Sequence, residues 1–405
     1  MSLGDSLNKQ LHIAGRSGSD ARFSSTPEAY KARLDIGDDG GFIQSIPYPS
    51  GQVPDAKDIL QSFDLDPLQW VVTGLRRSKW QRYDGEFLES HRITVVPVAV
   101  QQQDKADVEQ MVKELSKWKP SKVSYLKTTG PELAFVFAPS DQQIGKKQGG
   151  EGTPQTVSRI ITATDGAVQR LSDLRRVGRN INTVVISLLG DHVEGNVSQG
   201  GRLQSHSASD LGLTEQTRVG RRLLMAQVKA FAPLADRVIV AVVNGNHDEV
   251  SRQVALDPSE GWNTEIASSV QDACAENSAL SHIEFRYPAK DHQTLAIDVN
   301  GTMLGLFHGH QSGKNVSLYL QEQSAGKTSL GMADVWLSGH YHSYRSMDIG
   351  ERFWAQCPTL DPGSAWYRDR HGLESNPGIL TMVIGNGHDA RQDLSIIPVT
   401  RRTTQ

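Results

Sequence analysis

Five short segments of the sequence contain side chains that commonly bind metal ions. In chain order they are residues 140–145 (SDQQIG), 190–195 (GDHVEG), 245–248 (GNHD), 308–310 (HGH) and 339–342 (GHYH). Carboxylate, amide and imidazole groups without thiolates suit Mn, Fe, Zn or Mg better than a soft metal. The set is large enough for two divalent ions sharing one carboxylate. Such a pair can activate water and neutralise charge during displacement at phosphorus.

The residues around these segments predict the elements that position them. Apolar runs that predict buried strands occur at 133–137, 183–189, 238–243, 302–307 and 335–337. Segments 155–177 and 218–231 have the apolar spacing of helices. This alternation predicts an α/β fold with a sheet covered on both faces. Because active sites of such folds collect at the carboxyl ends of strands, we expect the five segments to converge.

The N-terminal third has a different pattern. Residues 1–45 are rich in Ser, Gly, Asp and Arg, which predicts a flexible tail. Residues 46–130 predict a small α+β module made of a helix, a hairpin and a second helix. The hairpin strands are expected near 70–72 and 93–96, and the second helix at 104–118. Residues 131–405 are assigned to the domain that carries the five segments.

Composition restricts the class of protein. The 405 residues include 42 Lys+Arg and 46 Asp+Glu, a balance that argues against a wholly basic nucleic-acid binder. Two cysteines exclude a disulfide framework and a cysteine-rich zinc module. We see no signal peptide and no run of about 20 apolar residues that would span a membrane. We therefore expect a soluble, cytoplasmic protein without a membrane partner.

The five segments, in this order, resemble the signature of the calcineurin-like metallophosphoesterases. The motifs of that family read D-x-H, G-D-x-x-D/E, G-N-H-D/E, H and G-H-x-H. The resemblance covers roughly residues 131–400. It implies a four-layer αββα sandwich for the catalytic domain and a phosphoesterase activity that uses two divalent metal ions. Mn is the expected metal, with Mg, Fe or Zn as alternatives.

The resemblance also implies a role for individual residues. Asp191 would bridge the two ions. The first ion would also be held by Asp141, Gln143 and His342. The second ion would also be held by Asn246, His308 and His340. His247 would act on the phosphate or donate a proton to the leaving oxygen, and Asp248 would orient His247.

Gln143 departs from the family pattern, which has His at this position. An amide oxygen is a neutral ligand and weaker than imidazole. We therefore expect lower affinity at the first metal site, or a preference for Mn or Mg. The alternative is a partly degenerate site that binds one metal and only recognises phosphate.

Other residues are candidates for contacts with the substrate. Four lie near the motifs or beside the long polar loop 196–214: His192, Arg218, Arg222 and His310. The hairpin has basic residues interleaved with an aromatic one, a pattern that suits single-stranded nucleic acid: Arg76, Arg77, Lys79, Trp80 and Arg82. The alternative for the hairpin is a solvated strand face. Residues 385–389 (GNGHD) imitate the third motif with an extra glycine, and we interpret them as a turn.

Three functions fit these patterns. The first is a DNA exonuclease or endonuclease, because the motif set resembles the SbcD-type repair nucleases and phage-encoded metallophosphoesterases. The extra N-terminal module departs from the SbcD-type arrangement, which usually begins with the first motif. The second is a phosphatase or phosphodiesterase that acts on a protein or a small molecule. The third is a non-catalytic protein that binds phosphate or nucleic acid through a weakened metal site.

Overall fold

The computed structural model describes residues 32–37, 40–50, 55–82, 84–148, 150–197, 209–251, 256–363 and 376–399. The chain divides into two compact units, Met1–Asp107 and Val108–Gln405. This boundary lies before the expected one near residue 130. The reason is that Val108, Met111 and Leu115 belong to the main apolar cluster of the second unit.

The described part of the first unit contains a five-stranded antiparallel sheet with a helix packed on it. The strands are β1 (Arg33–Gly37), β2 (Gly40–Gln44), β3 (Tyr48–Pro49), β4 (Trp70–Gln81) and β5 (Phe87–Pro97). The strand order is β1-β2-β5-β3, and β4 pairs with the other edge of β5. Helix α2 (Ala56–Ser62) covers one face through Ile59 and Leu60, which pack on Ile43 and Ile93.

Strands β4 and β5 lie where the hairpin was expected, and strands β1 and β2 lie within residues 1–45, for which a flexible tail was expected. Strands β1 and β2, at residues 33–37 and 40–44, pair with each other, and β2 pairs with β5. The physical reason is the alternation of Leu34, Ile36 and Ile43, whose side chains join the apolar cluster beneath the sheet. Residues 1–31 lie outside the described residues. Helix α3 (Val98–Lys117) corresponds to the predicted second helix and begins earlier.

The second unit contains a six-stranded sheet with the order β16-β15-β6-β7-β8-β9. Its parallel strands are β6 (Leu133–Ala138), β7 (Ile181–Leu188), β8 (Arg237–Val242) and β9 (Ile283–Arg286). Two antiparallel strands complete it, β15 (Gly378–Ile384) and β16 (Ser395–Pro398). The central strands are buried on both faces, which explains their continuous apolar sequences.

A second sheet has the order β10-β11-β12-β14-β13. Its strands are β10 (Leu295–Val299), β11 (Thr302–Leu306), β12 (Val335–Ser338), β13 (Arg345–Ile349) and β14 (Arg352–Gln356). Strands β11, β12 and β14 are parallel. The two sheets share a buried apolar cluster that includes Val136, Ile239, Leu304 and Leu337. The sheets therefore pack face to face.

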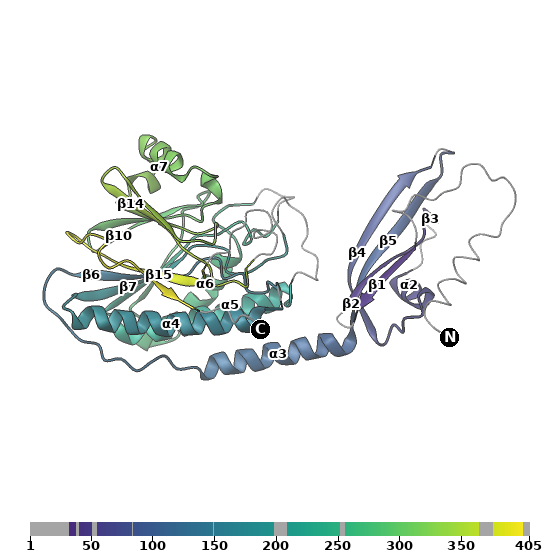
Figure 1. Cartoon of the computed structure of the whole chain (residues 1–405), viewed down its shortest axis with the longest axis horizontal. Coiled ribbons are helices and arrows are strands. Elements are labelled where there is room, and N and C mark those ends of the chain that lie inside the picture. Colours follow the sequence, from purple (N-terminus) through teal and green to yellow (C-terminus); the bar gives the residue numbers. More distant parts are fainter. Residues whose placement is uncertain are drawn as a thin grey trace. The chain divides into compact units, whose positions relative to one another are not determined.

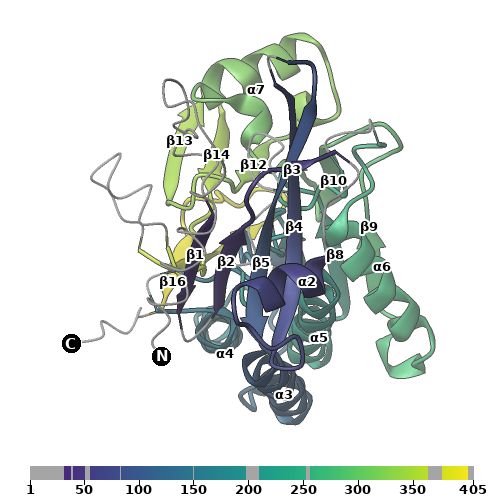
Figure 2. The ribbon, with the colours of Figure 1, turned by 90° about the vertical axis from the view of Figure 1, so that its right-hand side faces the viewer.

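Helices cover the outer faces of the two sheets. The helices are α4 (Thr153–Arg176), α5 (Leu213–Phe231), α6 (Trp262–Ala275) and α7 (Val316–Ala325). Short 3₁₀ turns lie at Ala232–Leu234, Ser278–Leu280, His310–Ser312 and Leu330–Met332. Helices α4, α5 and α6 share an apolar cluster with the first sheet, and α7 shares one with the second. Figures 1 and 2 show α7 on one side of the unit and α4 with α5 on the other.

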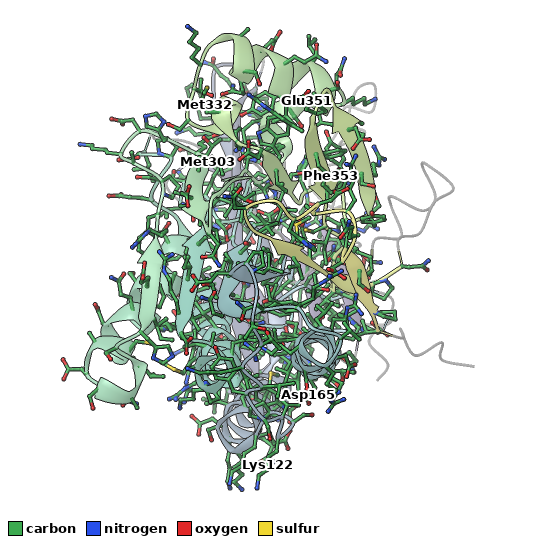
Figure 3. The ribbon with its side chains drawn as sticks, turned by 90° about the vertical axis from the view of Figure 1, so that its left-hand side faces the viewer. Lys122, Asp165, Met303, Met332, Glu351 and Phe353 are labelled. Atoms are coloured by element: carbon green, nitrogen blue, oxygen red, sulfur yellow. The ribbon has the colours of Figure 1, made fainter. Side chains whose placement is uncertain are left out.

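The expected α/β fold class is confirmed. Figure 3 labels side chains on opposite sides of the second unit. Met303 and Phe353 lie on one side of the unit, and Asp165 lies on the other side. The predicted helices at 155–177 and 218–231 are α4 and α5, although α5 begins earlier. Among the described residues, no helix combines the length and the apolar character needed to cross a membrane.

Candidate metal centre

Loops that follow parallel strands bring the five segments together at one edge of the two sheets. Strands β6, β7 and β8 run parallel, and so do β11 and β12, so their carboxyl ends lie side by side. Five of the predicted ligands have a positive φ: Asp141, Gln143, Asp191, His340 and His342. Side chains other than glycine rarely adopt this conformation, and such residues cluster at functional sites. The backbone of these loops is therefore arranged for the site.

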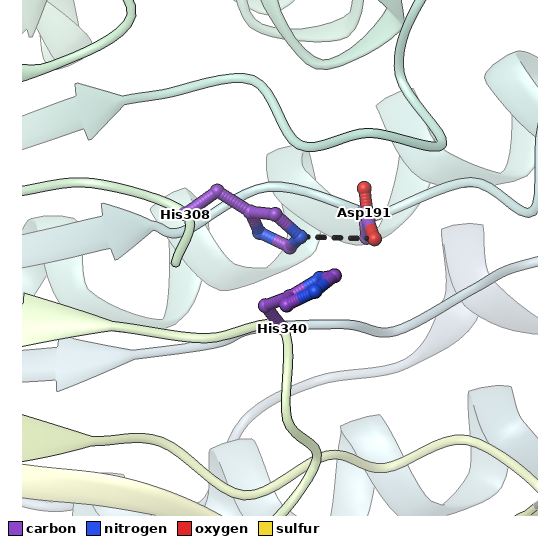
Figure 4. Close-up of side chains that lie close together, drawn as sticks. All are labelled: Asp191, His308 and His340. Carbon is purple, nitrogen blue, oxygen red and sulfur yellow. Dashed lines mark ion pairs between the residues drawn. The ribbon is translucent and has the colours of Figure 1, made fainter. Parts of the chain in front are cut away.

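Three predicted ligands form the centre of the cluster. Ligand atoms of Asp191, His308 and His340 all lie within 4.8 Å of one another (Figure 4). The Nδ1 of His308 lies 2.7 Å from the carbonyl oxygen of Leu189, to which it must donate a proton. His308 Nε2 lies 3.0 Å from Asp191 Oδ2. In neutral His308 two acceptors would face each other there, so the pair requires a proton or a metal cation.

The charges in this cluster shift the pKa values of its members. Burial lowers the pKa of His308, but the charges of Asp191 and Asp141 outweigh it and raise the pKa to about 9. Burial raises the pKa of Asp191, yet the charges of His308 and His247 hold it below its usual range. Burial, together with the charge of His308, lowers the pKa of His340 to about 4. The cluster therefore combines an ionised Asp191, a neutral His340 and a strong tendency to hold a positive charge at His308. A bound metal cation could supply that positive charge.

The remaining predicted ligands from the first and last motifs lie beside this cluster. Asp141 Oδ1 is 3.3 Å from His342 Nε2 and 3.9 Å from His308 Nε2. Asp141 Oδ2 accepts a hydrogen bond of 2.9 Å from the His340 backbone N–H. Gln143 Nε2 is 3.4 Å from His342 Nε2. The structure thus brings Asp141, Gln143 and His342 together, as the motif order suggested.

The loop after β8 packs against Asp191. The His247 backbone N–H donates a 2.7 Å hydrogen bond to Asp191 Oδ1. A side chain at Gly245 would collide with the Asp191 carboxylate, so this close approach requires glycine. Asn246, which lies between Gly245 and His247 in the sequence, is also buried. Both of its neighbours in this loop therefore contact or closely approach Asp191.

His247 contacts Glu194, whereas Asp248, which was expected to orient His247, has other partners. His247 Nδ1 lies 2.9 Å from the Glu194 carbonyl oxygen and 3.5 Å from its carboxylate. Asp248 Oδ2 instead accepts hydrogen bonds of 2.7 Å from the backbone N–H groups of Asp191 and Gly245. Burial, reinforced by the charge of Asp191, raises the pKa of Asp248 to about 7. Asp248 therefore holds two metal-site loops together and does not contact the His247 ring.

Sequence reasoning missed Lys146 and Asp361. Lys146 Nζ forms an ion pair with Asp361 and lies 2.5 Å from Gln143 Oε1. Asp361 Oδ2 is also 3.3 Å from His342 Nδ1. Burial raises the pKa of Asp361, but the charges of Lys146 and His342 outweigh it and hold this pKa well below the usual range. Lys146 follows the first motif directly, whereas Asp361 lies in a sixth loop, after β14, that has no motif.

The four expected substrate contacts have different positions. His310 is half-buried, and its ring centre lies 5.4 Å from that of His308, so it borders the cluster. His192 is only 5% exposed, and burial lowers its pKa to about 4. Arg218 and Arg222 are exposed on α5, and Arg218 pairs with Glu109 on α3. These arginines are on the solvent side of a helix whose other side packs on the sheet, so the prediction that they reach the site is not supported.

The basic hairpin lies in the first unit, and strand alternation divides its residues between two faces. Arg77 and Lys79 form ion pairs with Glu89, which is only 1% exposed. Arg82 pairs with Asp84 and Glu86 at the end of the hairpin. Arg76 and Trp80 alternate with Arg77 and Lys79 along β4 and therefore point to the opposite face. The five residues do not form the single patch that the sequence suggested.

Comparisons with known proteins identify similar folds only. No protein-family profile and no curated protein sequence matches the chain. Vps29 from Entamoeba histolytica complexed with Zn²⁺ is 13% identical, covering 62% of this chain and 87% of that chain, with a TM-score of 0.29. A novel archaeal phosphodiesterase is 13% identical, covering 65% and 99%, with a TM-score of 0.31. A predicted phosphoesterase from Streptococcus pneumoniae TIGR4 is 12% identical, covering 63% and 84%, with a TM-score of 0.25. Similarity at this level does not extend to function.

Proposed function

We propose that this protein is a metal-dependent phosphoesterase that hydrolyses phosphodiester bonds, with DNA as its substrate and Mn as its metal. The observation that carries the proposal is the group formed by Asp191, His308 and His340, whose ligand atoms lie within 4.8 Å of one another. The facing acceptors of Asp191 and His308, 3.0 Å apart, fit a divalent cation. These three residues and Asn246 would hold the metal. When bound, the metal would activate water and neutralise charge on the phosphoryl oxygens.

His247 supplies the proton-transfer group of the proposed reaction. Its Nδ1 donates to the carbonyl oxygen of Glu194, so the ring is held in one orientation and Nε2 remains available for the substrate. The Glu194 carboxylate also lies 3.5 Å from Nδ1. When the ring carries a proton on Nε2, it can donate that proton to the leaving oxygen. His247 thus acts as a general acid without binding the metal.

The open face of the first unit supports DNA as the substrate. Arg33, Gln44, Arg92 and Arg76 are paired in register across four strands and therefore lie in one row on one face. Phe42 shares this face, with the Arg92 guanidinium 3.6 Å and the Arg33 guanidinium 5.6 Å from its ring centre. Arginines beside a half-buried aromatic ring can attract a phosphate backbone and stack on bases. Helix α2 covers the opposite face, and no described helix of this unit packs on this one.

Two substrates test the proposal in separate steps. Bis(4-nitrophenyl) phosphate reports hydrolysis of a simple phosphodiester in the presence of Mn. End-labelled linear single-stranded and double-stranded DNA report nuclease activity. We expect Mn-dependent hydrolysis of both kinds of substrate and loss of both activities in Asp191→Asn. Hydrolysis of the small diester without cleavage of DNA would instead identify a small-molecule phosphodiesterase.

His388→Ala is the matched control for His247→Ala. His388 stands in a similar sequence, but it follows β15, which runs antiparallel to β6. Its loop is therefore at the opposite edge of the sheet from the metal centre. His247→Ala should slow hydrolysis, and His388→Ala should not. Equal activity in both variants would refute the assignment of His247, and unchanged activity in Asp191→Asn would refute the metal-dependent mechanism.

A further inference from the structure

A lysine side chain lies among the residues expected to hold the first of two metal ions. Lys146 Nζ contacts Gln143 Oε1 at 2.5 Å and forms an ion pair with Asp361. Asp361 is fully buried and also contacts His342 Nδ1 at 3.3 Å. Lys146 itself is 14% exposed. The protein's own cation is therefore held next to two of the expected ligands, Gln143 and His342.

Lys146 also determines which end of the Gln143 amide faces the site. An ammonium group only donates hydrogen bonds, so the atom that contacts Lys146 must be the amide oxygen. The amide nitrogen then faces His342 Nε2, at 3.4 Å. An amide nitrogen has no lone pair to offer to a metal ion. Gln143 is therefore unable to act as a ligand while Lys146 keeps this contact.

The positive charge of Lys146 also disfavours a metal ion at the first site. The Lys146 ammonium is separated from the His342 ring by one amide group, so it repels a divalent cation bound there. It also neutralises Asp361, the carboxylate behind His342. Among the described residues, no lysine or arginine is paired with Asp191, His308 or His340. Of the two expected metal sites, only the one formed by Asp191, His308 and His340 is thus fully suited to a divalent ion.

We propose that the protein binds a single divalent metal ion, at Asp191, Asn246, His308 and His340, and that the Lys146 ammonium takes the place of the other ion. This inference rests on the proposed function, because it describes the metal centre of the same site. Lys146 has three N–H donors, of which Gln143 and Asp361 use two. The third can donate to a phosphoryl oxygen of the substrate, so Lys146 supplies positive charge that a second metal would otherwise supply.

Metal content and electron paramagnetic resonance test this proposal independently of activity. The full-length protein is loaded with Mn, desalted and analysed by elemental mass spectrometry. We expect one Mn per chain and the spectrum of an isolated Mn ion. The double variant Gln143→His and Lys146→Met restores an imidazole and removes the ammonium. It should bind a second Mn and show the spectrum of two exchange-coupled ions.

Three further variants control this experiment. Lys147→Met removes the exposed neighbouring lysine and should leave one Mn per chain. Lys146→Arg keeps a cation and should also bind one. Gln143→His alone keeps the Lys146–Asp361 ion pair, so it should still bind one even if the double variant folds poorly. Two Mn ions in that single variant would show that Lys146 does not exclude the second ion and would overturn the proposal.

The outcomes for the unmodified protein separate this inference from the proposed function. Two exchange-coupled Mn ions, with hydrolysis of bis(4-nitrophenyl) phosphate, would overturn the inference and leave the proposed function intact. One Mn per chain without hydrolysis would support the inference about the metal centre and refute the phosphoesterase. No bound Mn in a folded protein would overturn both.

Discussion

Replacing Lys146 by methionine should destabilise the protein because it leaves the fully buried Asp361 without its ammonium partner. Removing one partner of a buried ion pair costs about 3–5 kcal/mol. Asp361 keeps contacts with His342 Nδ1 at 3.3 Å and with the Gly363 backbone N–H at 2.9 Å. We therefore expect the lower end of this range, about 3 kcal/mol, for the loss in free energy of unfolding.

Urea denaturation in the presence of a chelator measures this loss. The buried Trp336 and Trp354 of the second sheet provide the fluorescence signal for the second unit. Added Mn should narrow the difference between Lys146→Met and the unmodified protein, because the variant gains room for a second cation beside Asp361. At about 100 times the dissociation constant, binding of an ion stabilises the folded state by about 2.7 kcal/mol. Such binding would offset most of the loss.

Two results would refute this reasoning. A loss below about 1 kcal/mol without metal would be typical of an exposed ion pair and would contradict the buried pair of Lys146 and Asp361. A difference between the two proteins that Mn does not change would show that Lys146 does not stand where a metal can bind. The double variant Lys146→Met and Asp361→Asn serves as the control. It should recover part of the lost stability, because the two residues interact directly.

Further predictions concern the catalytic group and both folded units. His247→Ala should lower kcat by roughly 10²–10⁴ with unchanged metal content, and loss of metal would show that His247 is a ligand. Arg92→Glu should weaken binding of labelled single-stranded DNA and reduce its salt dependence by about one ion, without changing hydrolysis of the small diester. The ion pair with Arg77 lowers the pKa of Glu89 to about 2. Its stabilising effect should therefore be present above the ordinary pKa of 4.5 and be lost as pH falls toward about 2, and acid unfolding of Glu89→Gln should lack this component. Phe231→Ala should cost about 3–5 kcal/mol in chemical denaturation, because its ring packs on Phe137, with the ring centres 5.1 Å apart.

Strands and motif loops were predictable from the sequence because their signals are local. The apolar runs at 133–137 and 183–189 are buried on both faces, which leaves hardly any room for polar residues. The polar motif residues follow directly after these strands, and they meet because parallel strands end at a common edge of the sheet. The grouping of Asp191, His308 and His340 agrees with this expectation.

Local sequence patterns were misleading where the face of a strand or the boundary of a unit depends on contacts with residues distant in the sequence. The basic residues of the hairpin appear as one patch in the sequence, but alternation along β4 places Arg76 and Arg77 on opposite faces. Residues 33–37 and 40–44 follow a polar segment of the sequence, yet they form strands because β2 pairs with β5 and β1 pairs with β2. Helix α3 is continuous, and the packing of Val108 and Met111 determines where the second unit begins.

The sequence by itself determined the kinds of metal-binding group and the edge at which they meet, because both follow from local patterns and from the direction of parallel strands. Only the tertiary structure decided how these groups are paired. Glu194, and not Asp248, contacts the His247 ring, because the loop after β7 packs against the loop after β8. Asp361 reaches Lys146 from a loop more than two hundred residues later in the chain. Contacts of this kind depend on side-chain distances in three dimensions, and no spacing in the sequence records them.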